Sequence, residues 1–207
     1  MRQVKMALKI VGLAFRDIWQ EFWTILIVHL LFLLGIILIL PGPPAIVALF
    51  FYGNRIAHGE SATERDFLRA MRRYWGPAWR WGLLNLFMIG LLTGDYYLTA
   101  RLTDNTSIAA FIQGLYIALL AVWLLLQLFA LPFMLEQTQP QVPQALRNAA
   151  VFIGKNLIFV LVFALLLLFS LAAGMLVFML TFAFGGVFLA FAGNRAVLEH
   201  LEASQAA

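Results

Sequence analysis

Residues 22–56 read FWTILIVHLLFLLGIILILPGPPAIVALFFYGNRI, and this stretch decides the expected fold. Its first part, Phe22 to Leu40, is uncharged and long enough for a helix to cross a hydrocarbon core about 30 Å thick. Pro41-Gly42-Pro43-Pro44 must end that helix, because proline lacks an amide hydrogen and clashes with the preceding turn. The following span, Pro43 to Ile56, reaches only about 21 Å as a helix. Either the bilayer thins beside this short span, or its first turn begins below the outer surface in a protein-lined recess.

The composition extends this interpretation to the whole chain. Of its 207 residues, 63% are hydrophobic and 12% are charged, and the mean hydropathy is +0.91. A soluble domain carries about 25% charged residues, so water is not the main solvent of this chain. Its length suits one domain, residues 1–207, without a further soluble domain. We therefore expect an all-α membrane protein, a bundle of about six transmembrane helices with amphipathic helices on its inner surface.

The spans are expected at about 22–40, 43–56, 81–102, 108–135, 157–179 and 182–197. Residues 1–20 alternate charged and bulky apolar side chains, which predicts an amphipathic helix on the inner membrane surface. The segments 58–80 and 137–156 are basic cytoplasmic loops. The first of them is expected to hold a second surface helix that ends near Gly76-Pro77. The tail, 199–207, is expected to be loose.

The basic residues predict the orientation. If successive spans cross the membrane in alternating directions, 13 of the 14 Lys and Arg residues fall on one side, and only Arg101 falls on the other. Cytoplasmic loops carry such an excess, so both termini are expected in the cytoplasm. The net charge of +4 is spread over loops beside the membrane, which favours anionic lipid headgroups of the inner leaflet as partners, and no nucleic acid is expected.

Short matches suggest an internal repeat. Leu68-Arg69 precedes Gly76 with the spacing at which Leu146-Arg147 precedes Gly154, and Gly53-Asn54-Arg55 recurs as Gly193-Asn194-Arg195. A parallel tandem repeat of an outside-to-inside helix, a surface helix and an inside-to-outside helix would explain these matches. Coincidence would explain them as well.

Polar residues inside apolar spans are the candidates for a functional site, because polar groups at membrane depth are costly. His29, Asp95, Tyr96 and Tyr97 are the candidates for a polar intramembrane site. The alternative is that His29 and the amides of Asn85 and Gln127 bond across helices, while Asp95 is hydrated or paired with Arg101.

Two further sets of residues are singled out by their spacing. Arg65, Arg69, Arg72 and Arg73 recur at helical spacing and form a candidate docking face for a cytoplasmic partner or for anionic lipid. The small residues Gly90, Gly94, Ser170 and Gly174 predict close helix packing within the chain rather than dimerisation.

Signatures of enzymes are missing from the sequence. It has no cysteine, no phosphate-binding loop and no nucleophile elbow, and its three histidines are scattered. We expect a non-enzymatic protein with no cofactor and no metal.

One part of the chain resembles a known family. The residues that carry this resemblance are Leu40-Pro41-Gly42-Pro43-Pro44-Ala45, Ala48-Leu49-Phe50, Arg55-Ile56, Gly59-Glu60, Asp66-Phe67, the basic stretch to Arg73, and Asp95. In these residues the chain resembles the YesL-like family of small bacterial membrane proteins. The resemblance covers mainly residues 40–98. It implies an integral protein of the bacterial plasma membrane, of unknown molecular activity and associated with carbohydrate uptake, which assists ABC-type importers.

Three functions remain open at this point. The leading hypothesis is a non-enzymatic accessory component of a carbohydrate uptake system that contacts ABC importer subunits. The alternative is a stand-alone carrier or channel for a small solute, with a recess from the short second span toward Asp95. A weaker third hypothesis is a lipid-handling or membrane-shaping protein.

Overall fold

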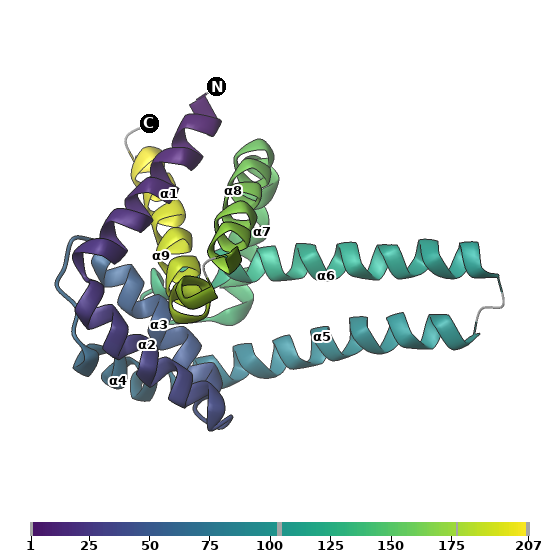
Figure 1. Ribbon diagram of the computed structural model, residues 1–207, viewed down its shortest axis with the longest axis horizontal. Helices are drawn as coiled ribbons and strands as arrows, with labels where there is room; N and C mark the ends of the chain where they lie inside the picture. Colours follow the sequence, from purple (N-terminus) through teal and green to yellow (C-terminus); the bar gives the residue numbers. More distant parts are fainter. Residues whose placement is uncertain (1, 103–104, 177, 206–207) are drawn as a thin grey trace.

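The computed structural model describes the backbone of residues 2–102, 105–176 and 178–205, and the side chains of 3–102, 105–173 and 185–202. These residues form nine helices (Figure 1). They are α1 (Arg2–Gln20), α2 (Phe22–Ile37), α3 (Gly42–Ala57), α4 (Glu64–Arg73), α5 (Trp75–Leu102), α6 (Thr106–Leu135), α7 (Val142–Lys155), α8 (Leu157–Leu176) and α9 (Phe178–Gln205).

An amphipathic helix followed by two further helices that pack against each other occurs three times in the described residues, as the units α1–α2–α3, α4–α5–α6 and α7–α8–α9. The bend from α1 to α2 is 93°, and the bend from α7 to α8 is 101°. The sequence matches fall at corresponding places. The two Gly-Asn-Arg tripeptides lie on α3 and α9, the last helices of their units, and the two Leu-Arg pairs lie on α4 and α7. In this helix order each unit begins with its amphipathic helix, and the tandem repeat itself stays a prediction.

The last helices of the three units meet in the centre, where α3, α6 and α9 pack against one another. Each surface helix packs on the last helix of the unit before it: α4 on α3, and α7 on α6. The N-terminal helix α1 packs on α9 and so closes a ring. The centre holds large aromatic side chains with almost no exposure, among them Tyr52, Phe129 and Phe191. Burial of this aromatic surface is the main stabilising term for the centre.

The Gly-Asn-Arg tripeptides bring α3 and α9 close together. A Cβ added at Gly53 would lie 3.1 Å from the Phe191 ring, and one added at Gly193 would lie 2.9 Å from the carbonyl oxygen of Leu128 on α6. The buried Asn194 side chain donates from Nδ2 to the carbonyl oxygens of Phe50, at 2.9 Å, and Ala190, at 2.8 Å. The approach at Gly193 leaves no room for a side chain, the approach at Gly53 leaves little, and the Asn194 amide ties the two helices together.

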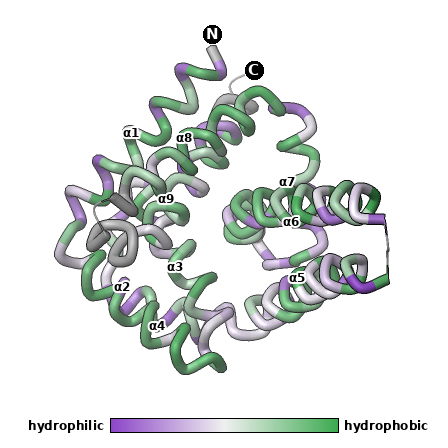
Figure 2. Tube along the Cα trace, turned by 45° about the vertical axis from the view of Figure 1, so that its right-hand side comes forward, coloured by the Kyte–Doolittle hydropathy of each residue, from purple (hydrophilic) through white to green (hydrophobic). Residues whose placement is uncertain are grey.

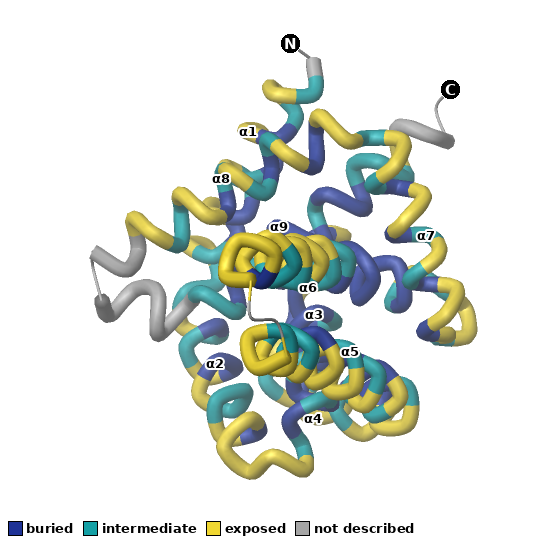
Figure 3. Tube along the Cα trace, turned by 90° about the vertical axis from the view of Figure 1, so that its right-hand side faces the viewer, coloured by how far each residue is buried: buried dark blue, intermediate teal, exposed yellow. Residues whose placement is uncertain are grey.

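The hairpins diverge from the centre. In Figure 1 the hairpin of α5 and α6 projects to the right, and Figure 3 looks along it while α2 and α8 run away in other directions. The helices α5 and α6 have 28 and 30 residues, so each is about 42 to 45 Å long. Their projecting parts are apolar in Figure 2 and exposed in Figure 3, with Leu86 70% and Phe111 77% exposed. An apolar exposed hairpin of this length is typical of membrane-spanning structure.

In the described residues, two helices, α5 and α6, are each long and apolar enough to cross a membrane, and up to four spans result if each bent pair counts as one. The prediction of an all-α protein with membrane spans is confirmed to this extent. The number of about six spans stays a prediction, because α2 and α3 have only 16 residues each.

Two boundaries differ from the sequence-based expectation. The surface helix α4 ends at Arg73, and Gly76-Pro77 lie inside the first turn of α5, where proline is tolerated because its missing amide hydrogen has no helical partner. The tail is helical rather than loose as far as Gln205, because α9 continues to that residue. There Glu199 accepts a hydrogen bond from Lys9 Nζ at 2.8 Å, which ties the end of α9 to α1.

Candidate functional site

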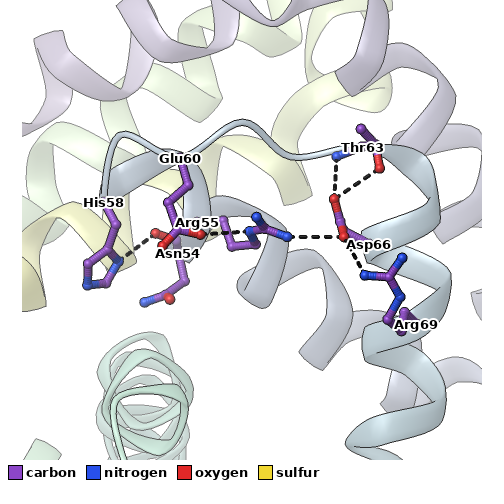
Figure 4. A network of polar contacts seen from close by, with 7 residues as sticks. All are labelled: Asn54, Arg55, His58, Glu60, Thr63, Asp66 and Arg69. Atoms are coloured by element: carbon purple, nitrogen blue, oxygen red, sulfur yellow. Dashed lines mark hydrogen bonds and ion pairs between the residues drawn. The ribbon is translucent and has the colours of Figure 1, made fainter.

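A polar cluster lies between the end of α3 and the start of α4 (Figure 4). Arg55 Nε donates to Glu60 Oε2 at 2.9 Å, and Arg55 Nη1 lies 3.0 Å from Asp66 Oδ1. The same Asp66 oxygen accepts from Arg69 Nη1 at 3.1 Å. Asp66 Oδ2 accepts from the backbone N and the Oγ1 of Thr63, at 3.0 and 2.9 Å, which forms the capping box of α4. The cluster therefore fixes α4 to the end of α3.

The carboxyl of Asp66 is tuned by these contacts. Its partial burial acts to raise the pKa, but the two hydrogen bonds from Thr63 and the charges of Arg55 and Arg69 act in the other direction and outweigh it. The pKa of Asp66 is therefore below its ordinary value, and the side chain stays ionised as the anchor of the network.

A second branch joins α3 to the end of α6. Asn54 Nδ2 donates to Glu136 Oε1 at 2.6 Å, and the same oxygen lies 3.6 Å from His58 Nε2. His58 Nδ1 lies 2.9 Å from the carbonyl oxygen of Asn54. We refer to the surface formed by residues 54–73 and 136–148 as the basic face.

The basic face contains an open groove of about 700 Å³ at the turn from α6 to α7. Polar and mostly amide side chains line it, together with two apolar ones: Phe133, Glu136, Gln137, Thr138, Gln139, Gln141, Gln144, Asn148 and Leu201. Glu136 both lines this groove and accepts from Asn54, so the groove borders the cluster around Arg55. Neutral amides can donate and accept hydrogen bonds, which suits a polar partner segment.

The four arginines predicted as a docking face are all exposed on α4, but they are not equivalent. Arg69 is committed to Asp66, whereas Arg65 and Arg72 form no ion pair within the described part of the chain. The guanidinium of Arg73 lies 5.6 Å from the centre of the Tyr74 ring, also without a carboxylate partner there. Phe67 and Ala70 on the other side of α4 are buried and hold the helix in place. Three of the four predicted arginines are thus presented by a fixed helix.

The residues predicted for a polar intramembrane site do not come together. His29 is buried in α2, where its ring lies 5.8 Å from that of Phe32. The α5 helix approaches the first hairpin at Gly82, and Asp95 lies 13 residues, about 20 Å, farther along the projecting part of α5. Tyr96 and Tyr97 stack edge to face with each other at 5.4 Å, and Tyr97 is 68% exposed. A pocket shared by His29 and Asp95 is therefore absent from the described residues.

The amides of the long hairpin bond across helices as expected. Gln127 Oε1 on α6 accepts from Trp81 Nε1 on α5 at 2.8 Å, and Asn85 Oδ1 on α5 accepts from Trp123 Nε1 on α6 at 3.0 Å. The two tryptophans were not foreseen as the donors, and the spacing of Trp81 and Asn85 on one helical face is the signal that indicates them. These hydrogen bonds form a polar seam that joins α5 to α6.

The predicted packing role of Gly90 and Gly94 is wrong. A Cβ added at either position would meet no atom within 4 Å, because both glycines face away from the other described helices. The close approaches occur instead at Gly35, Gly82, Gly53 and Gly193. Ser170 is half-buried on α8, and the surroundings of Gly174 lie outside the described side chains.

Among the described residues, no group of three or more His, Asp or Glu side chains has the arrangement of a metal site. No protein-family model, no curated protein and no solved structure matches this chain. The fold and the basic face together define an all-helical protein with candidate membrane spans and a polar surface at one end of its helices.

Proposed function

We propose that this chain is a non-enzymatic, multi-pass protein of the bacterial plasma membrane that acts as an accessory component of a carbohydrate uptake system of the ABC type. Both termini and the basic face lie in the cytoplasm, where excess Lys and Arg are expected. The resemblance of residues 40–98 to the YesL-like family is what connects the chain to carbohydrate uptake.

One observation carries the docking role. Arg65, Arg72 and Arg73 are exposed on α4 and form no ion pair with the described residues, while the cluster around Asp66 holds that helix in place. A fixed row of free guanidinium groups beside an open amide-lined groove supports recognition of an acidic cytoplasmic surface. The anionic headgroups of the inner leaflet are the alternative ligand for the same three arginines.

The test is gentle extraction of the tagged protein from its native membrane, followed by mass spectrometry of the proteins that remain bound. The variant carries Arg65→Glu, Arg72→Glu and Arg73→Glu, and Arg69 is left intact because it supports Asp66. The matched control is Arg101→Glu, a charge reversal at the opposite end of α5. Importer permease or ATPase subunits should copurify with the wild type and the control, and be lost from the triple variant.

Two results would count against this function. Recovery of the wild-type protein without importer subunits removes its main support. Importer subunits that remain bound to the triple variant would place the docking contact elsewhere, and the groove residues Gln144 and Asn148 would be the next to change.

A stand-alone carrier or channel is the second candidate, and the half-buried carboxyl of Asp95 favours it. Gln113 Nε2 on α6 donates to the carbonyl oxygen of Tyr96 at 3.2 Å, so polar groups from both helices gather beside Asp95. Reconstituted vesicles test this function directly. A solute flux that falls in Asp95→Asn would support it, and the absence of flux for every sugar and ion tested would exclude it for those solutes.

A further inference from the structure

The turn between α2 and α3 is exposed and purely apolar. Ile37 is 74% exposed, and Leu38, Ile39 and Leu40 are 59%, 78% and 62% exposed. The turn between α5 and α6 has a different character. The described residues beside it include four that are polar and exposed, Arg101, Asn105, Thr106 and Ser107. A turn that meets water or headgroups is normally polar, so the two hairpins end in different surroundings.

The length of α3 limits how deep the first hairpin can reach. Asn54 and Arg55 belong to the polar cluster of the basic face, and Gly42 begins the helix 12 residues earlier. Twelve residues of α-helix span about 18 Å, whereas the hydrocarbon core is about 30 Å thick. Even if it stood upright, the hairpin would end well short of the opposite headgroups.

Contacts of the turn with other helices independently indicate that the hairpin reaches only part of the way across the membrane. A Cβ added at Gly82 would lie 2.7 Å from Pro43, in the first turn of α3. Gly82 is only seven residues, about 10 Å, from the start of α5 at Trp75, and most of α5 lies beyond it. A Cβ at Gly35 would lie 3.9 Å from Met71 Cε on the surface helix α4. The turn therefore lies near the surface that carries α4 rather than beside the far end of α5.

The amide hydrogens of the turn are suited to an apolar environment. Five amide groups of the turn donate to backbone carbonyl oxygens of the same segment, at distances from 2.6 to 3.1 Å. The pairs, donor first, are Leu38 to Leu34, Ile39 to Ile36, Leu40 to Leu38, Gly42 to Ile39 and Ala45 to Pro41. Positions 41, 43 and 44 are prolines, which have no amide hydrogen. Every amide hydrogen from residue 38 to residue 45 is thus either bonded internally or absent, as hydrocarbon surroundings require.

The residue at the centre of the turn supports the same conclusion. Ile39 adopts a φ of +60°, a conformation that glycine or asparagine normally supplies and that is rare for a β-branched residue. A turn in water would accept either residue, whereas contact with lipid favours an apolar side chain despite the strain.

We infer that α2 and α3 form a re-entrant hairpin, which enters the leaflet beside the basic face and returns to the same side. Its turn, Ile37 to Leu40, contacts the acyl chains of phospholipids. This inference rests on the proposed membrane location, and it accounts for the Pro-Gly-Pro-Pro motif as the end of a partial rather than a full crossing. Both ends of the hairpin stay on the basic side, so the orientation of the remaining chain is unchanged.

Site-specific labelling tests the inference, because the chain has no cysteine and each introduced thiol is unique. The test variants are Ile37→Cys and Leu40→Cys. The controls are Ser107→Cys beside the turn of the long hairpin and Ser61→Cys in the loop before α4, both at exposed positions. Each variant is treated with a membrane-impermeant maleimide in intact cells, in inverted membrane vesicles and after denaturation in SDS.

We expect Ser107→Cys to react only in intact cells and Ser61→Cys only in inverted vesicles. The thiols at positions 37 and 40 should react at least about tenfold more slowly than these controls in either preparation, because an apolar environment suppresses the reactive thiolate, and should react fully in SDS. A nitroxide at position 37 should be accessible to oxygen and protected from a water-soluble nickel reagent.

Two outcomes would overturn the inference. Labelling of Ile37→Cys in intact cells at the rate of Ser107→Cys would mean that the hairpin crosses completely. Rapid labelling in inverted vesicles, or protection of the nitroxide from oxygen as well, would place the turn in water or under another protein. The controls at positions 61 and 107 report the membrane location by themselves, so failure of the proposed location is distinguished from failure of the re-entrant hairpin.

Discussion

Arg195 Nε donates a hydrogen bond of 2.8 Å to Asp17 Oδ2, although the two residues lie 178 positions apart in the chain. The carboxyl of Asp17 is only 3% exposed, and it also accepts from Arg16 at 3.2 Å. This ion pair lies where α1 meets α9 and closes the ring of three units. The corresponding contact between α3 and α4 is that of Arg55 with Asp66, and both arginines belong to the repeated Gly-Asn-Arg tripeptide.

Removal of one member of this buried pair should destabilise the protein. Arg195→Gln leaves the Asp17 carboxylate buried with only the exposed Arg16 beside it, and we expect the free energy of unfolding in micelles to fall by about 3 kcal/mol. Lys9→Gln breaks the pair with Glu199, in which Lys9 is 59% exposed, and should cost less than about 1 kcal/mol. Equal losses in the two variants, measured by denaturant titration, would contradict the role of Asp17 in ring closure.

The glycines offer a matched comparison of close and open positions. Gly193→Ala would place a methyl group 2.9 Å from the backbone oxygen of Leu128, which cannot rotate away, and overpacking of this kind costs about 1 to 3 kcal/mol. Gly90→Ala meets open space, and we expect it to be neutral or to stabilise α5 by up to about 1 kcal/mol. The thermal unfolding midpoints of the two variants test this difference, and only that of Gly193→Ala should fall. A destabilised Gly90→Ala would instead reveal a contact of α5 with a second molecule.

The polar seam between α5 and α6 should stabilise the long hairpin. Gln127→Leu leaves the indole N–H of Trp81 without its acceptor on α6, which should cost about 0.5 to 2 kcal/mol in a membrane protein. The control Thr93→Val removes a hydroxyl that bonds only to carbonyl groups of its own helix, at Ile89 and Gly90. Unfolding in micelles should distinguish the two variants, and the seam would be dispensable if they unfold alike.

Acid should loosen the attachment of α4. The pKa of Asp66 is lowered in the folded protein, so its contribution to stability is present above the ordinary carboxyl pKa near 4 and is lost as the pH falls through the lower folded value. We expect the thermal midpoint of the wild type to drop more steeply below about pH 4 than that of Asp66→Asn, which has no carboxyl at this position. Parallel pH profiles of the two proteins would show that Asp66 is not the group responsible.

Much of the helical architecture follows from the sequence. The uncharged stretch before Pro41 predicts an apolar helix and its end, and α2 and α3 follow with an interruption at residues 38–41. The alternation of charged and apolar residues in 1–20 likewise predicts α1. Such properties depend on neighbours along the chain, namely on local hydrophobicity and on the missing amide hydrogen of proline.

The tertiary structure alone decided which side chains meet. Helical spacing already pairs Asp66 with Arg69 at i,i+3, but the ion pair of Asp66 with Arg55 joins two helices and follows only from the tertiary structure. The Gly90-Gly94 spacing suggests packing, but the close contact is at Gly193. In a helix that is apolar on all sides, hydrophobicity does not mark the face that packs against protein, so pairing depends on shape and on a few polar groups. For the same reason, helix length and composition left open how far the first hairpin reaches, and the close approach of Pro43 to Gly82 is the tertiary contact that supports the shallow hairpin we infer.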